Sequence, residues 1–152
     1  ACFSAQLAER LNGICTIRVM EAAAGQRLTR ATALIAPGGW NLEITPGLRV
    51  KLSEDSGPGV MRPSVDVTFA SVAKVFGPAA VGVVLTGMGK DGAEGVQAMH
   101  RAGSRIIVQD HQSATAYGMP RAAMETGCAD AVLPLEKIAG HLLALSARET
   151  NR

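Results

Sequence analysis

The sequence has few aromatic residues and almost no net charge. Phenylalanine, tyrosine and tryptophan together make up 3% of its 152 residues, and 15 basic side chains are balanced by 13 acidic ones. No segment interleaves basic with aromatic residues, the pattern by which many proteins bind nucleic acids. The composition therefore disfavours nucleic acid as a partner.

Cysteine and long apolar runs are also scarce. The three cysteines, Cys2, Cys15 and Cys128, are far apart and form no CxxC pair, which argues against a disulfide framework and against a zinc site. No apolar run reaches the length of a membrane span, and the first residues lack the basic and then apolar pattern of a signal peptide. These absences predict a protein of the reducing cytoplasm, with no membrane insertion.

Small aliphatic residues are what the sequence does contain. Hydrophobic residues make up 47% of the chain and charged residues 18%, a composition typical of α/β proteins. Residues 81–145 alternate expected strands with expected helices, which requires right-handed crossovers and a parallel sheet. We therefore predict an α/β fold with a doubly wound, mostly parallel sheet, helices on both of its faces and a small antiparallel hairpin within 40–53.

Apolar periodicity and turn residues predict the individual elements. The expected helices are 3–12, 63–76, 91–102, 120–126 and a last one from Pro134 that buries Leu135, Ile138, Leu142 and Leu145. The expected strands are 14–20, 31–37, 40–45, 48–53, 81–86, 105–109 and 129–133, with a loop at 53–61. Residues 1–147 are expected to form one domain, followed by a frayed tail at 148–152.

Residues 81–95, VGVVLTGMGKDGAEG, hold the most informative pattern. Their apolar start predicts a strand covered on both faces, and Gly87 and Gly89 end it in a tight turn. Asp91 follows at the expected start of a helix. Open parallel sheets present their chemistry at the carboxyl ends of the strands. The pattern therefore predicts a carboxylate held at such an end.

The same glycines also allow dinucleotide binding. Gly87, Gly89 and Gly92 match G-x-G-x-x-G between a strand and a helix, and Asp110 ends the next strand 18 residues later, close to the usual spacing of about 20. Asp91 argues against this interpretation, because its charge would stand where a pyrophosphate has to meet the helix N-terminus.

A catalytic carboxylate is the competing interpretation of Asp91, since an aspartate can orient a histidine during acyl transfer. The structural alternative is a helix cap, the commoner role of an aspartate at such a position. No serine lies in a G-x-S-x-G elbow. Of His100, His111 and His141, the second is best placed, and a relay of Asp91, His111 and Ser113 stays open at this point.

Several segments together resemble one known family. They are LTGMGKDGAEGVQAMHRAG (85–103), QDHQSATAYGMPRAA (109–123) and MRPSVDVTFASVA (61–73), preceded in the matching order by ERLNG (9–13), EAAAGQ (21–26) and IAPGG (35–39). The chain resembles, over nearly all of its length, the catalytic domain of the CheB-type protein-glutamate methylesterases of bacterial chemotaxis. The resemblance implies hydrolysis of glutamyl methyl esters on chemoreceptors, often with deamidation of receptor glutamine, by a Ser-His-Asp triad. It implies no metal and no organic cofactor.

The resemblance also implies roles for individual residues. Asp91 matches the triad aspartate, and Met88 matches the loop methionine that lines the catalytic site. Arg62, Tyr117 and Met119 lie in segments that match the border of the substrate cleft. The implied partner is a methylated chemoreceptor helix, and a receiver domain in the full-length protein is a second partner common in the family.

The sequence departs from the family in two respects. The family's nucleophilic serine and catalytic histidine lie upstream of the position that matches Ala1, so Asp91 is the only triad member expected in this chain. Asn41 stands where relatives often have histidine. Three explanations stay open: the chain is the C-terminal part of a longer protein, it is an inactive relative that binds a receptor or partner, or another chain supplies the missing residues. An N-terminus that opens directly into a helix favours the first.

Overall fold

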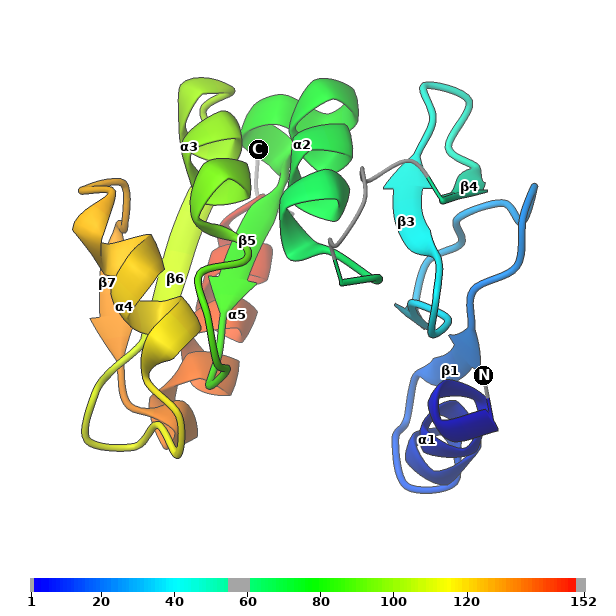
Figure 1. Ribbon diagram of the computed structural model, residues 1–152, viewed down its shortest axis with the longest axis horizontal. Coiled ribbons are helices and arrows are strands. Elements are labelled where there is room, and N and C mark those ends of the chain that lie inside the picture. Colours follow the sequence, from blue (N-terminus) through cyan, green and yellow to red (C-terminus); the bar gives the residue numbers. More distant parts are fainter. Residues whose placement is uncertain (1, 55–60, 150–152) are drawn as a thin grey trace. The chain divides into compact units, whose positions relative to one another are not determined.

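A computed structural model describes residues 2–54 and 61–149 of the chain (Figure 1). Most of the loop expected at 53–61 and the last three residues of the expected tail lie outside the described residues. The chain divides into two compact units, Ala1–Phe76 and Gly77–Arg152. The expectation of a single domain over 1–147 stays a prediction.

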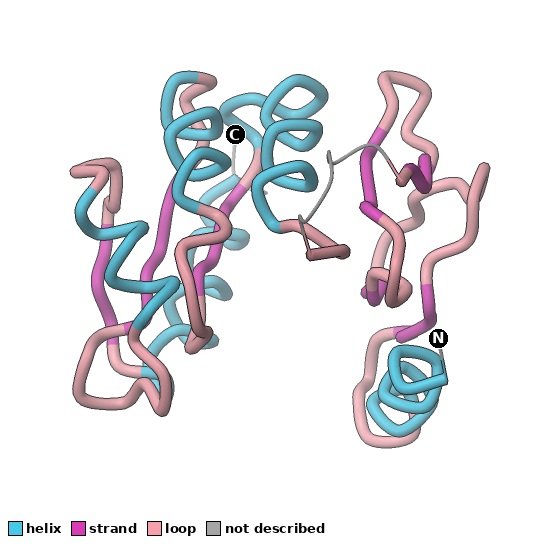
Figure 2. The backbone as a smooth tube through the Cα atoms, in the orientation of Figure 1, coloured by secondary structure: helices cyan, strands magenta, loops and turns pink. Residues whose placement is uncertain are grey.

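Within its described residues, the first unit has two helices and two small sheets (Figure 2). Its elements are α1 (Cys2–Asn12), β1 (Arg18–Glu21), β2 (Thr32–Ile35), β3 (Asn41–Ile44), β4 (Val50–Ser53) and α2 (Val65–Phe76). Strands β1 and β2 run parallel, whereas β3 and β4 form the expected antiparallel hairpin. Helix α1 packs on β1, and α2 packs on β3.

Strand β1 begins four residues later than the sequence predicted, at Arg18 instead of residue 14. The amides of Ile14 and Cys15 both donate to the carbonyl oxygen of Leu11, at 3.1 and 2.9 Å, and so prolong the last turn of α1. Ile14 is consequently 76% exposed. The apolar residues at 14–17 therefore gave a wrong start for this strand.

Polar side chains fix helix α2 to strand β3. The amide of Ile44 donates to the Ser71 hydroxyl at 3.0 Å, and the Thr68 hydroxyl donates to the carbonyl oxygen of Leu42 at 2.8 Å. Leu42 and Ile44 are themselves buried in the core of this unit. The helix thus covers the hairpin with both apolar and hydrogen-bonding contacts.

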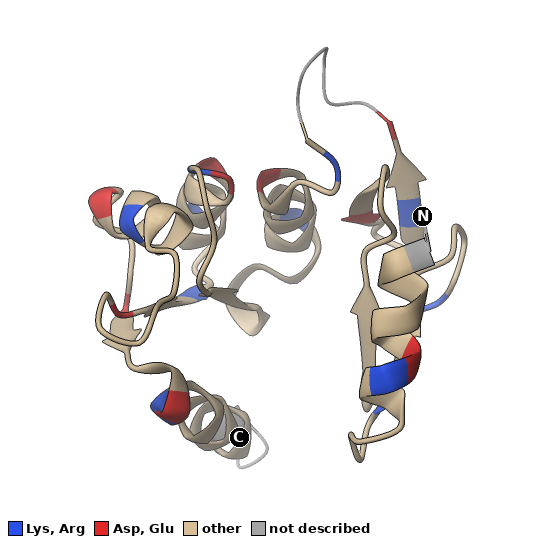
Figure 3. Ribbon diagram, turned by 60° about the horizontal axis from the view of Figure 1, so that its bottom comes forward, with Lys and Arg blue, Asp and Glu red and all other residues tan. Residues whose placement is uncertain are grey.

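Among the described residues of the second unit, three parallel strands form one sheet in the order β5-β6-β7. The elements of this unit are the short 3-10 helix η1 (Gly77–Ala79), β5 (Val81–Val84), α3 (Ala93–Arg101), β6 (Arg105–Gln109), α4 (Gly118–Glu125), β7 (Ala131–Leu133) and α5 (Leu135–Glu149). Figures 1 and 3 show α3 and α4 on one face of this sheet and α5 on the other. Together with the hairpin, this confirms the predicted α/β fold.

Strand β6 is the most deeply buried strand of the second unit. Ile106, Ile107 and Val108 expose at most 1% of their surface, because strands flank β6 on both edges and helices cover both faces. The strand predicted at 105–109 is confirmed with the same bounds. Burial of Leu135 was wrong: this first residue of α5 is 50% exposed, while Ile138 is 5% exposed.

The charged side chains are mixed in sign over both units. Every α-helix of the described residues carries at least one acidic and one basic residue (Figure 3). None of these helices is long and apolar enough to cross a membrane.

Candidate functional site

Asp91 lies on the loop that connects the end of β5 to α3. Gly89 and Gly92 adopt positive φ angles of 82° and 95°, a region that side chains other than glycine rarely adopt. Gly92 is the N-cap residue of α3, so Asp91 stands one position before the cap. Its side chain is half-buried. The glycine turn and the position of this carboxylate at the end of a parallel strand agree with the sequence pattern.

A second loop, residues 110–117 between β6 and α4, is fixed to the Asp91 loop by hydrogen bonds. The Thr86 hydroxyl donates to the carbonyl oxygen of Ala116 at 3.1 Å and accepts from the Ala116 amide at 2.8 Å. The amide of Gly87 donates to the same carbonyl at 2.9 Å, and the amide of Met119 donates to the carbonyl oxygen of Gly87 at 2.9 Å. The two loops therefore form one connected surface at the carboxyl ends of β5 and β6.

Two glycines allow these loops to approach each other. A methyl group on Gly87 would collide with the sulfur of Met119, and Gly118 packs directly against the backbone of Gly89. The sequence had singled out the first loop but not the close approach of Gly118. The sequence YGMP contains an indication of this close approach, because a glycine stands there just before the expected helix.

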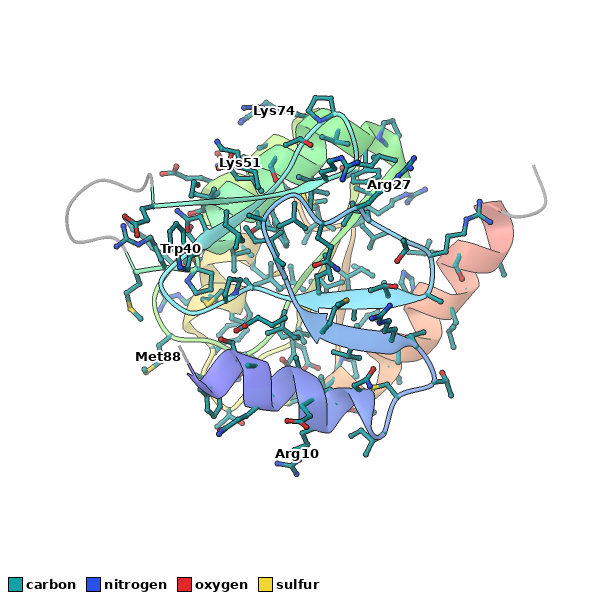
Figure 4. All side chains as sticks on the ribbon, turned by 90° about the vertical axis from the view of Figure 1, so that its right-hand side faces the viewer. Arg10, Arg27, Trp40, Lys51, Lys74 and Met88 are labelled. Carbon is teal, nitrogen blue, oxygen red and sulfur yellow. The ribbon has the colours of Figure 1, made fainter. Side chains whose placement is uncertain are left out.

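The second unit brings four of the five predicted site residues onto these two loops and the first turn of α4. Met88 is 87% exposed and its side chain points away from the loop (Figure 4). Tyr117 is half-buried and packs against the edge of His111, with ring centroids 4.8 Å apart. Met119 is half-buried against Gly87. Asp91 completes the group.

Arg62, the fifth predicted residue, lies in the first unit. Its side chain is exposed, and its Nη1 donates to the carbonyl oxygen of Glu54 at 2.7 Å. The neighbouring amide of Ser64 donates to Oδ1 of Asn41 at 3.0 Å, and Asn41 is fully buried. Asn41 therefore has a structural contact at the base of the segment that carries Arg62.

Sequence reasoning missed Gln109, the last residue of β6. Its side chain is 1% exposed, accepts a hydrogen bond from the Thr86 amide at 2.7 Å and donates one to the Ser113 hydroxyl at 3.2 Å. A buried amide at the end of a strand forms bonds to both loops. The sequence does contain an indication of this residue, because Gln109 is the polar residue that follows the apolar residues of RIIVQ.

The relay of Asp91, His111 and Ser113 that the sequence left open is wrong. The Ser113 hydroxyl donates to Oδ1 of Asp110 at 2.7 Å and accepts from Gln109. The Ser113 backbone amide and hydroxyl hold the pKa of the Asp110 carboxyl below its usual value. Because the serine proton is committed to Asp110, it is not shared with His111.

The structure also argues against the dinucleotide interpretation. That interpretation needs an open backbone at Gly87 and Gly89, where a pyrophosphate would approach. Met119 covers Gly87, and Gly118 lies against the backbone nitrogen and carbonyl oxygen of Gly89. The glycines accommodate a neighbouring loop of the same unit.

Metal ligands do not gather at these loops. Among the residues that the structure describes, no group of three or more His, Cys, Asp or Glu side chains could hold a metal ion.

Comparisons with known proteins match most of the chain. A family model described as CheB methylesterase matches residues 1–142. A protein-glutamate methylesterase/protein-glutamine glutaminase of Chromobacterium violaceum is 48% identical over 145 residues, which are 93% of this chain and 40% of that protein. One of Xanthomonas campestris pv. campestris is 47% identical over 151 residues, 97% of this chain and 42% of that protein. The chain thus spans about two fifths of the length of these relatives.

A solved structure matches the fold as well. The crystal structure of the Thermotoga maritima CheB methylesterase catalytic domain is similar with a TM-score of 0.90 and 33% sequence identity, covering 95% of this chain and 78% of that chain.

Proposed function

This chain belongs to the CheB methylesterase family, and from that premise we propose that the complete protein hydrolyses methyl esters of glutamate side chains on chemoreceptors. The same chemistry on a glutamine side chain releases ammonia instead of methanol, so deamidation is part of the proposal. One observation carries it: Asp91 is a half-buried carboxylate at the carboxyl end of a parallel strand, on a loop fixed by hydrogen bonds to its neighbour.

Asp91 is the orienting carboxylate of the proposed mechanism. It accepts a hydrogen bond from Nδ1–H of a histidine, which fixes the tautomer whose Nε2 faces a serine hydroxyl, and it stabilises the imidazolium that forms. The family resemblance implies that this serine and this histidine precede the position of Ala1. Their presence in the complete protein is part of the proposal.

The reaction proceeds by two transfers of the acyl group. The serine oxygen attacks the ester carbonyl while the histidine takes the serine proton, and the intermediate collapses as the histidine gives that proton to the departing methanol. Water then attacks the acyl-enzyme, again with the histidine as base, and releases the glutamate side chain and the free serine. These steps use no metal and no organic cofactor.

The proposed substrate is an amphipathic receptor helix, and four residues are proposed to contact it. Met88 offers an exposed apolar side chain on the same loop as Asp91. Tyr117 follows on the adjoining loop and Met119 in the first turn of α4; Arg62 is the contact proposed from the first unit. A receiver domain in the complete protein is the proposed regulatory partner. The proposed compartment is the cytoplasm, where free thiols such as those of Cys15 and Cys128 persist.

The test uses the protein expressed from its complete gene and a methylated chemoreceptor, with methanol release as the measurement. Asp91→Asn is expected to lower kcat on the order of 10⁴-fold, because the histidine loses the carboxylate that selects its tautomer. Glu94→Gln is the matched control, since this exposed acid lies three residues further along, in the first turn of α3, and is expected to keep full turnover.

Two outcomes would contradict the proposal. If Asp91→Asn released methanol at close to the wild-type rate, Asp91 would have a structural role only. A complete wild-type protein that binds the receptor without releasing methanol would favour the inactive binding module instead.

A further inference from the structure

The buried side chain of Gln109 connects segments that follow all three strands of the second unit. Its Oε1 accepts from the Thr86 amide, which follows β5, at 2.7 Å. Its Nε2 donates to the Ser113 hydroxyl, which follows β6, at 3.2 Å. That hydroxyl also accepts from the amide of Leu135, which follows β7, at 3.0 Å. One carboxamide therefore lies at the centre of the sheet's carboxyl edge.

The chemistry of this network requires an amide at position 109. The backbone amide of Thr86 needs an acceptor, and Gln109 is one of the two donors, with the Leu135 amide, to the Ser113 oxygen, whose own proton goes to Asp110. A carboxamide offers both, an aliphatic side chain offers neither, and an ionised carboxylate only accepts. Because Gln109 is 1% exposed, water does not replace a partner that is lost, and an unmet bond is costly.

Gln109 contacts the Asp91 loop at its start, through the hydrogen bond to Thr86. The loop is held there by Thr86, through its amide to Gln109 and its hydroxyl to Ala116, and it is held in the middle by Gly118 against Gly89. It ends at Gly92, the N-cap of α3. Loss of the Gln109 bond leaves the start of this loop attached only through the Thr86 hydroxyl and the Gly87 backbone, to Ala116 and Met119.

We propose that Gln109 is a positioning residue for Asp91: its buried carboxamide sets the loop geometry in which the Asp91 carboxylate meets the histidine. This rests on the proposed function. Gln109 touches neither substrate nor histidine in this proposal, so it governs the rate of the chemical step more than the binding of the receptor helix.

The first test compares Gln109→Met with the wild type, both made from the complete gene. Loss of both hydrogen bonds is expected to lower kcat for methanol release on the order of a hundredfold, the effect of displacing a catalytic group by about 1 Å, with KM nearly unchanged. Ser104→Ala is the matched control. Ser104 is also buried and hydrogen-bonded, to the carbonyl oxygen of Gly77 at 2.6 Å, but it precedes β6 and lies at the opposite end of that strand.

The second test is rescue by a near-isosteric variant. In Gln109→Glu, the neutral acid can accept from Thr86 and donate to Ser113, whereas the ionised form cannot donate and lies close to the charge of Asp110. Its kcat is therefore expected to approach the wild-type value at low pH and to fall away as pH rises, giving a pH profile that neither Gln109→Met nor Ser104→Ala shows.

Hydrogen exchange separates this inference from the proposed function. In Gln109→Met, the amides of 86–92 and 113–119 are expected to exchange faster together, whether or not the protein is an esterase. An inactive wild type with this coupled exchange would defeat the proposed function and leave the positioning of the loop intact. An active enzyme in which Gln109→Met keeps wild-type kcat, or in which the two loops exchange as before, would overturn the inference.

Discussion

A methyl group on Gly118 would stand 2.8 Å from the backbone nitrogen of Gly89 and 2.9 Å from its carbonyl oxygen. Contacts this short with backbone atoms cannot be relieved by turning a side chain. The first residue of α4 and the middle of the Asp91 loop therefore lie too close together to leave room for a side chain on Gly118. This contact explains why the loop after β6 bears directly on the position of Asp91.

Gly118→Ala is expected to push the two loops apart. The cost of such overpacking is about 1–3 kcal/mol of unfolding free energy, and kcat for methanol release is expected to fall with it. Urea denaturation and steady-state kinetics on the complete protein measure the two effects. Unchanged stability together with unchanged kcat would mean that the loops tolerate separation.

Gly140→Ala is the control for this substitution. Gly140 lies within α5, and among the described residues no atom outside this helix lies within 4 Å of the position of an added methyl group. Alanine is expected to stabilise the protein there by about 1 kcal/mol, the difference in helix propensity, without any change in kcat.

Ser113→Ala is expected to raise the pKa of Asp110 only part of the way to its ordinary value. The backbone amide of residue 113 is the largest cause of the lowered pKa and remains in the variant, while the hydroxyl, the second cause, is lost. Because the folded pKa lies below the unfolded one, Asp110 favours folding above the unfolded pKa, and this contribution disappears as pH falls through the folded value. Carboxyl NMR titration of both proteins measures the change, and an unaltered pKa would contradict the assignment of this hydrogen bond.

Much of the fold follows from local sequence patterns. RIIVQ predicted β6 to the residue because an apolar run between Gly103-Ser104 and Asp110 admits few other structures. The hairpin around Pro46-Gly47 was equally well marked. The strand predicted from residue 14 started too early because the amides of Ile14 and Cys15 bond to the last turn of α1. The predicted burial of Leu135 was wrong because the spacing of apolar residues does not indicate whether the first turn of a helix packs against the sheet.

The site was predictable only in part. Glycines followed by an aspartate indicate a turn at a strand end, so the Asp91 loop could be found from its own residues. The role of Gln109 depends on Thr86, which is 23 residues away in the chain, and no local pattern reports which loops meet. The contact of Gly118 with Gly89 likewise exists only in the folded unit, so the sequence around Gly118 does not indicate its partner.

Glu43 on β3, in the first unit, has a carboxylate whose pKa is lowered by both a hydrogen bond and an ion pair, and the two effects can be compared. Its carboxylate accepts from the Ser53 hydroxyl at 2.6 Å and lies 3.1 Å from Nζ of Lys51, directly across the hairpin. The Ser53 hydrogen bond is the largest cause of its lowered pKa, ahead of Lys51 and the more distant Lys74; Figure 4 labels both lysines.

Ser53→Ala is expected to raise the pKa of Glu43, because it removes the largest single cause of the lowered value, and at high salt to raise it more than Lys51→Gln does. The difference is expected to widen as salt is added, since salt screens the charge of Lys51 but leaves the short hydrogen bond. Carboxyl NMR titration at two ionic strengths measures it. As for Asp110, the lowered pKa favours folding above the unfolded value, and this contribution is lost on acidification. A larger effect from Lys51→Gln at high salt would make the ion pair the main cause.

Asp130 gives the last prediction, because its two oxygens have unequal partners. Oδ2 accepts from the amide of the fully buried Ile106 at 2.7 Å, while Oδ1 lies 3.9 Å from Nη1 of Arg105, an exposed side chain. Asp130→Ala leaves a buried amide without an acceptor and is expected to cost about 1–3 kcal/mol of unfolding free energy. Arg105→Ala removes only a long surface ion pair and is expected to cost less than about 1 kcal/mol.

Asp130→Asn separates the two contributions further. Its carboxamide oxygen still accepts from Ile106 while the charge facing Arg105 is gone, so its stability is expected to stay close to that of Arg105→Ala in urea denaturation. If Asp130→Asn instead lost as much stability as Asp130→Ala, the charge and not the buried amide would account for the aspartate. The ion pair would then have to be stronger than its length and exposure allow.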